Sequence, residues 1–197
     1  MKSRSQTPLS ALIFVAALAA NSNANAAKPA ASAPPAAAAK NAFQDDYLKL
    51  LDDVEKKLLS LEEATPQDKF KWRPAAGVRS ISEAYLHVAF GNYTFTKIIT
   101  GKEPPADSGY AMGHDKWDLQ TTDKAAIKKI LEKSFDHVRA AVKAMPDADL
   151  DKKVSFFGHD MSARAVLMAL NGHQNEHLGQ SIAYARANNV TPPWSKG

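Results

Sequence analysis

Residues 162–188 read SARAVLMALNGHQNEHLGQSIAYARAN, and this stretch decides the fold. Its larger side chains recur at intervals of three and four residues, which is typical of an α-helix with one buried face. Ser162 before the first turn and Pro192 after the last fit the two ends of such a helix. The side chains that share the predicted buried face are Val166, Leu170, His173, His177, Gln180 and Tyr184.

Three further segments have the same periodicity. One begins near Phe43 and ends before Pro66, and another begins at Thr122-Asp123 and ends before Pro146. The segment between them opens at Ser80-Ile81-Ser82-Glu83, a capping-box pattern, and stops at Gly101. Four helices of about twenty residues in one domain predict an all-α fold, a four-helix bundle.

The connections between the helices carry several aromatic and histidine side chains. Residues 101–120 form a long predicted loop, and loops of this length inside a compact domain tend to be functional or mobile. Residues 153–161 turn at Gly158 and predict a short extended ribbon or hairpin. His114 and His159 lie in glycine-containing turns and are expected to be exposed, and His137 lies off the apolar stripe of its helix and is expected to be solvated.

The N-terminal residues predict export. Lys2 and Arg4 precede the apolar run 9–20, and small residues follow up to Ala26, as in a secretory signal peptide. We expect residues 1–26 to be removed after Ala26, residues 27–41 to form a disordered Ala/Pro-rich linker, and residues 42–197 to fold as one domain. The expected location is periplasmic or secreted, without stable membrane insertion after cleavage, and an uncleaved anchor is the alternative.

Composition excludes several functional classes. The chain has no cysteine, so a disulfide framework, a thiolate metal site and a cysteine nucleophile are ruled out. Its net charge is only +4, two of the positive charges lie in the predicted signal peptide, and no run of five like charges occurs. Nucleic acid is therefore not an expected partner.

Three histidines are the strongest candidates for chemistry. His173 and His177 are four residues apart on one helical face, the spacing at which two imidazoles can bind one metal ion. Burying each ring without a partner would cost roughly 1–3 kcal/mol. His87 lies on the inward face of another helix, so the three could converge and leave an open coordination position. The alternative is three core histidines, each bonded to a backbone carbonyl, a hydroxyl or water.

Polar residues near the three histidines are weaker candidates for metal ligation or catalysis. Glu176 points about 100° away from His177, so it is expected to be a surface or supporting carboxylate. No glutamate directly follows His173, which argues against a His-Glu-x-x-His protease. The capping role of Glu83 is sufficient to explain that residue. Tyr184 is expected to be a packed core residue, although the Tyr184 hydroxyl could also reach a bound substrate.

The order of several motifs resembles the DinB-like family of metal-binding four-helix bundles. The segments that carry the resemblance are Lys71-Trp72-Arg73-Pro74, residues 77–83, His87-Val88, residues 172–180, Tyr184-Ala185-Arg186 and Pro192-Pro193-Trp194. The resemblance implies an up-down-down-up bundle, a divalent metal, often zinc or nickel, on His87, His173 and His177, and pairing as a homodimer. Relatives include thiol-dependent S-transferases and metal-dependent hydrolases.

Two functions follow as expectations. The first is an exported metal-dependent enzyme that acts on a small molecule by thiol transfer or hydrolysis, with residues 101–120 capping its pocket. The second is a non-catalytic metal- or ligand-binding protein that serves an envelope stress response. An open metal position facing a solvent-connected pocket, with an acid or base nearby, would favour the enzyme.

Overall fold

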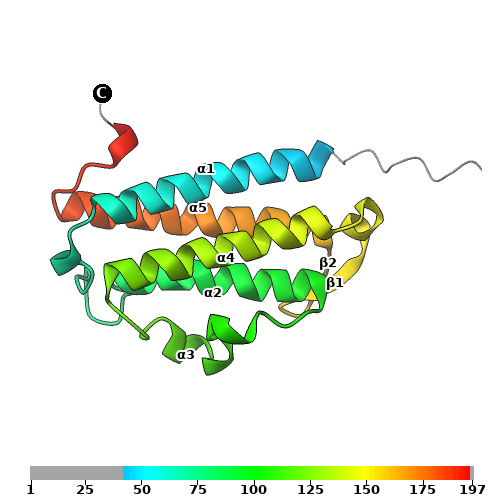
Figure 1. Ribbon diagram of the computed structural model, residues 1–197, viewed down its shortest axis with the longest axis horizontal. Coiled ribbons are helices and arrows are strands. Elements are labelled where there is room, and N and C mark those ends of the chain that lie inside the picture. The colour runs from blue at the N-terminus through cyan, green and yellow to red at the C-terminus, as the bar shows by residue number, and fades with distance from the viewer. Residues whose placement is uncertain (1–41, 196–197) are drawn as a thin grey trace, which may run out of the picture. The chain divides into compact units, whose positions relative to one another are not determined.

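The computed structural model describes residues 42–195, and four long helices form a bundle within them (Figure 1). The predicted all-α four-helix bundle is confirmed. The predicted signal peptide and linker, residues 1–41, lie outside the described part of the chain. The four helices are α1 (Ala42–Ala64), α2 (Ile81–Thr100), α4 (Lys124–Ala144) and α5 (Ala163–Ala187).

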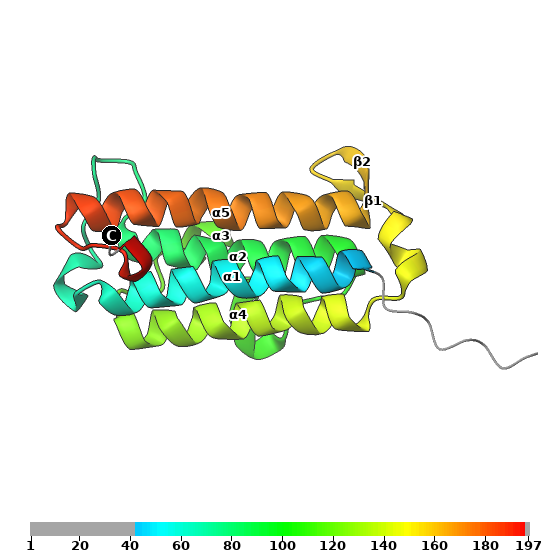
Figure 2. The ribbon, with the colours of Figure 1, turned by 90° about the horizontal axis from the view of Figure 1, so that it is seen from above.

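The helices run in an up-down-down-up order. α1 and α5 point in one direction, and α2 and α4 point in the other (Figures 1 and 2). α2 packs against both α4 and α5, and α1 packs against the same two helices. The bundle interior is filled by apolar side chains that include Leu51, Leu58, Leu86, Phe135 and Leu170, each fully buried. Among the described residues, none of the helices has the length and apolar character that crossing a membrane requires.

The start of α2 is fixed by the predicted capping box. The backbone N–H of Glu83 donates to the Ser80 hydroxyl (3.3 Å), and the backbone N–H of Ser80 donates to the Glu83 carboxylate (3.1 Å). Gly101 ends the helix in the left-handed conformation, with φ of 68°. Both boundaries are confirmed, and they hold His87 on the α2 face that packs towards α5.

The connection between α2 and α4 is more ordered than the predicted loop. It contains α3 (His114–Trp117) and the short helices Ala106–Ser108 and Tyr110–Met112. Trp117 is fully buried, and its indole N–H donates to the Leu86 carbonyl at 2.7 Å. Because this bond ties α3 to the second turn of α2, next to His87, the residues on either side of Trp117 lie close to His87.

The predicted hairpin is confirmed as β1 (Lys153–Phe156) and β2 (His159–Ser162), which pair antiparallel. The hairpin contacts α2 and α5, the two helices that carry the candidate histidines. The remaining short helices are Gln67–Lys69, Asp147–Asp151 and Pro193–Ser195.

A buried hydrogen-bonded chain fixes the register of three helices. The Asn92 amide on α2 donates to the Ser134 hydroxyl on α4 (3.0 Å), and the Gln174 amide on α5 donates to Asn92 (2.8 Å). All three side chains are fully buried, so sliding one helix would leave polar groups without partners. Since Gln174 follows His173, this chain helps to set the height of His173 against α2.

His137 is partly buried, whereas the sequence predicts a solvated side chain. Its ring centre lies 5.1 Å from that of Tyr93, and its Nε2 is buried without a partner. Burial lowers the pKa of His137. The prediction was wrong because Tyr93 reaches across from α2 and covers a ring that the helical stripe alone places outside the core. His137 also lines a cavity of about 530 Å³ that contains none of the three candidate histidines.

Candidate metal centre

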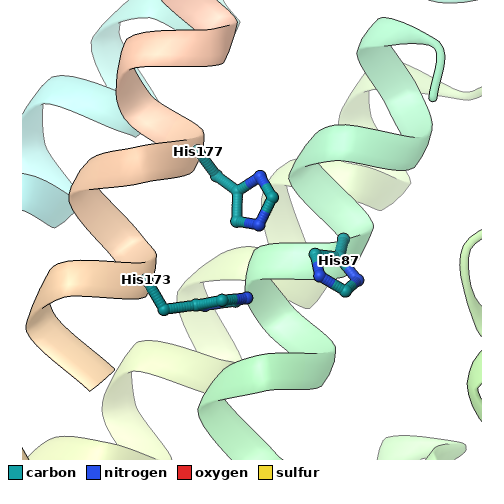
Figure 3. Close-up of side chains that lie close together, drawn as sticks. All are labelled: His87, His173 and His177. Atoms are coloured by element: carbon teal, nitrogen blue, oxygen red, sulfur yellow. The ribbon is translucent and has the colours of Figure 1, made fainter. Parts of the chain in front are cut away.

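The three predicted histidines meet in space. His87 extends from α2, and His173 and His177 extend from successive turns of α5 (Figure 3). One ring nitrogen from each lies within 4.8 Å of the other two. The ring centres are 4.6 Å apart for His173 and His177, 4.7 Å for His87 and His177, and 5.2 Å for His87 and His173. A single ion can therefore reach all three rings.

The surroundings of His87 settle which of its nitrogens carries the proton. Its Nδ1 lies 3.2 Å from His114 Nε2 and 3.5 Å from Asp118 Oδ2. His114 Nε2 also faces the Arg79 guanidinium at 3.2 Å, and because a guanidinium can only donate, this nitrogen must be an acceptor. His87 Nδ1 thus faces two acceptors and carries the hydrogen. Its Nε2 keeps the lone pair that a metal ligand needs.

A second chain of hydrogen bonds orients His177. Its Nδ1 lies 2.8 Å from the Gln180 side-chain oxygen, and the Gln180 amide donates to the Tyr184 hydroxyl at 2.8 Å. Nδ1 is therefore the donor, and Nε2 is left with its lone pair. Burial lowers the pKa of His177, against the opposing effect of the bond to Gln180, so the ring is neutral.

His173 is the histidine that the protein itself does not satisfy. Its Nδ1 is buried without a hydrogen-bond partner. Burial, aided by the neighbouring His177 and His87, lowers its pKa to about 3. The ring lies against the backbone of Gly91, where a Cβ would come within 2.4 Å of His173 Cε1. The glycine at position 91 therefore leaves the space that the His173 ring occupies.

These observations fit a divalent metal better than three ordinary core histidines. Two rings are held with Nε2 free, and the third has a buried nitrogen that neither a carbonyl nor a hydroxyl satisfies. Neutral imidazoles are the ligands that zinc and nickel accept in proteins. Metal ligation by His87, His173 and His177 stays a prediction, and the geometry it requires is present.

Two residues beside His87 are not predicted from the sequence to lie at the site. His114 is exposed as predicted, with 45% of its side chain accessible, but it also contacts the His87 ring. Asp118 is nearly buried, and its Oδ2 accepts a hydrogen bond from Arg79 Nε at 2.8 Å. Burial acts to raise the pKa of the Asp118 carboxyl, but hydrogen bonds and charge from His87 and Arg79 outweigh it and lower that pKa.

His87, His114 and Asp118 also bring ligand-type atoms within 4.8 Å of one another. The Arg79 guanidinium bonds to two of these groups, so it supplies the positive charge there. We therefore assign this second group to the support of His87 rather than to a second ion. The signal that could have revealed it is the spacing of four between His114 and Asp118, which places both on one side of a short helix.

A cavity of about 520 Å³ lies beside the groups that hold His87 and His177, and none of the three candidate histidines lines it directly. It is lined by residues that contact two of them: His114 and Asp118 beside His87, and Gln180 beside His177. Arg73 and Arg79 line it as well. Three carboxylates, an imidazole and two guanidinium groups thus face a space large enough for a small organic molecule.

The other candidates mostly keep the roles expected for them. Glu176 is exposed, and Glu83 caps α2 while it pairs with Arg73. Tyr184 is buried, with its hydroxyl bonded to Gln180 and its ring centre 5.4 Å from that of Trp72. His159 is exposed on the hairpin, as predicted.

Comparisons with known proteins agree with this fold. A DinB-like protein from Bacillus cereus ATCC 10987 superposes with a TM-score of 0.62 at 19% identity, covering 76% of this chain and 95% of that one. A DinB-like protein of Bacillus subtilis, YjoA, gives a TM-score of 0.55 at 18% identity, covering 77% and 94%. YfiT from Bacillus subtilis, described as a probable metal-dependent hydrolase with an unusual four-helix bundle topology, gives 0.59 at 14% identity, covering 83% and 97%.

A search of curated proteins found no match. The sequence profile of the DinB superfamily, however, matches residues 50–181, which include the three histidines and most of all four helices. This chain therefore belongs to the DinB superfamily.

Proposed function

We propose that this protein is a metal-dependent enzyme that acts on a small molecule, with a divalent ion held by His87, His173 and His177. The observation that carries the proposal is the 520 Å³ cavity, which is lined not by the three histidines themselves but by their direct partners, Asp118 and His114 beside His87 and Gln180 beside His177. A purely structural metal site would be dry and closed by a fourth protein ligand. A cavity with an acid and a base beside the ligands instead fits catalysis.

The residues around the cluster have separable roles. When bound, a divalent ion supplies Lewis acidity, which polarises a substrate and activates a nucleophile. Asp118 and Arg79 hold His87, and Gln180 holds His177, so the rings are oriented before anything binds. His114 accepts from Arg79 at Nε2 and therefore carries its hydrogen at Nδ1, which faces the Asp115 carboxylate at 3.4 Å on the wall of the cavity. A substrate in the cavity would compete with Asp115 for this hydrogen.

Hydrolysis is the reaction type we favour over thiol transfer. The chain has no cysteine, so an attacking sulfur would have to arrive with a second substrate, whereas water is always present. The structural similarity to YfiT, described as a probable metal-dependent hydrolase, points in the same direction. Zinc and nickel are the proposed metals, because both accept three imidazoles and leave positions open.

We also propose that the enzyme works outside the cytoplasm. Lys2, Arg4 and the apolar run 9–20 support export, and removal after Ala26 would leave the bundle on its linker. Pairing of two copies and the absence of nucleic-acid partners stay predictions.

The proposal is tested with zinc- or nickel-loaded protein and a panel of nitrophenyl esters and N-acyl amides. We expect turnover that a chelator abolishes and added metal restores. His173→Ala should lose both metal and turnover, and His159→Ala, which removes an exposed histidine from the hairpin, should keep both. Stoichiometric metal without turnover of any substrate would contradict the enzyme and favour the metal- or ligand-binding protein.

A further inference from the structure

The tip of the hairpin carries a phenylalanine that its own conformation disfavours. Phe157 and Gly158 form the two-residue turn between β1 and β2, and both have positive φ, at 48° and 86°. This is the arrangement of a type I′ turn, in which Asn-Gly is the preferred sequence. A bulky residue with positive φ is strained, so Phe157 is a poor choice for making the turn.

Burial in the core does not explain why position 157 carries a phenylalanine either. Phe157 is 70% exposed, the most exposed of the large apolar side chains in residues 42–195. An apolar ring that is both strained and exposed contributes little to folding, and backbone strain of this kind tends to occur where function requires it. The hairpin is therefore expected to have a role in which the outer face of this ring is used.

The position of the ring indicates what that role is. Its inner side packs on Phe156 and Phe95, with ring centres 4.6 Å and 6.4 Å away. Phe95 is nearly buried on α2, and its ring centre lies 5.5 Å from that of His173. A continuous row of aromatic rings thus leads from the hairpin tip to a candidate metal ligand, on the two helices that the hairpin contacts.

We propose that Phe157, which does not line the 520 Å³ cavity, forms a separate apolar subsite of the active site and contacts an aromatic or flat apolar group of the substrate. The inference rests on the proposed function, because it places the reacting group at the three histidines. Phe95 separates Phe157 from His173, so Phe157 meets a part of the substrate several bonds from the reacting atom. Contacts to such remote groups strengthen substrate binding and orientation. The substrate class is therefore a hydrolysable compound with a distant aromatic or apolar group.

The test separates this subsite from the metal centre by using two inhibitors of different length. Acetohydroxamate has only the metal-binding group, whereas 5-phenylpentanohydroxamate adds a phenyl ring on a chain. We expect Phe157→Asn in the metal-loaded protein to weaken binding of the phenyl compound by about tenfold and to leave acetohydroxamate unchanged. Phe157→Tyr should bind the phenyl compound as tightly as the wild type does, because the aromatic ring is kept.

The Phe157→Asn substitution is chosen so that it does not impair folding. Phe157→Asn supplies the Asn-Gly sequence that the turn prefers, so its thermal midpoint should equal or exceed that of the wild type. Leu50→Gln, which removes an exposed apolar side chain from α1, is the matched control and should affect neither inhibitor.

Three results would overturn the subsite. Equal binding of the phenyl compound to wild type and Phe157→Asn would show that the ring does not contact ligands. A lower thermal midpoint would show that Phe157 serves the fold. If Phe157→Asn instead changed the state of association, the exposed ring would belong to an interface between copies. Failure of acetohydroxamate to bind the wild type would mean that the proposed metal centre itself has failed.

Discussion

Gly91→Ala is the substitution that separates the metal centre from the fold most cleanly. A Cβ at position 91 would lie 2.4 Å from His173 Cε1 and 2.9 Å from its Nδ1. The ring must therefore retreat by about 1 Å to reach ordinary contact distance, whereas metal–ligand distances are held within about 0.2 Å. A shift of this size removes His173 from any ion that His87 and His177 share.

The expected loss of metal affinity is large, and the expected loss of stability is not. Disturbing only the outer partners of a metal ligand costs about 10- to 100-fold in affinity, so displacing the ligand should cost about 100-fold or more. An alanine in a helix interior is favoured over glycine by about 1 kcal/mol, which offsets the cost of turning one side chain. We expect a folded protein with wild-type helix content and weak metal binding.

Isothermal titration with zinc or nickel, together with thermal unfolding of the metal-free protein, measures both quantities. Gly179→Ala is the matched control, because it lies in α5 and a Cβ there meets nothing within 4 Å. That variant should keep its metal affinity and gain about 1 kcal/mol of stability. Wild-type affinity in Gly91→Ala would refute the assignment of His173 as a ligand.

Three further changes have expected outcomes. Asp118→Asn should lower metal affinity by about 10- to 100-fold in the same titration, because the carboxylate that orients His87 is lost, and an unchanged affinity would remove Asp118 from the site. Ser80→Ala should cost about 1 kcal/mol in urea unfolding through loss of the cap, and an identical curve would argue against the capping box. Glu62 is fully buried with both oxygens unpartnered, and burial raises its pKa to about 7, above the usual 4.5. Between these values the unfolded chain releases the Glu62 proton and the folded protein keeps it, so stability should fall by about 3 kcal/mol as pH rises from 4.5 to 7. Glu62→Gln should abolish this fall, and a variant with the same pH dependence would contradict it.

The sequence was sufficient for the ends of α2 and for the three histidines that converge. Ser80 and Gly101 marked the ends of α2, and the spacing of His173 and His177 with the inward face of His87 identified all three rings that converge. These inferences depend only on local geometry, because a helix fixes the direction of every side chain along it.

The sequence was insufficient where a neighbouring element decides the environment. His137 lies off the stripe of α4, and only the packing of α2 brings Tyr93 over it. His114 and Asp118 belong to a connection without a long period, and their place beside His87 depends on the bond from Trp117 to Leu86. The space that Gly91 leaves for His173 likewise depends on the register between α2 and α5.

Elemental analysis of protein purified without a histidine tag tests the central claim most directly. The account predicts about one zinc or nickel ion per chain in the wild type. It predicts none in a variant in which His87, His173 and His177 are all alanine and whose helix content is that of the wild type. A metal-free wild type that does not take up zinc or nickel, or equal metal content in the two proteins, would contradict it.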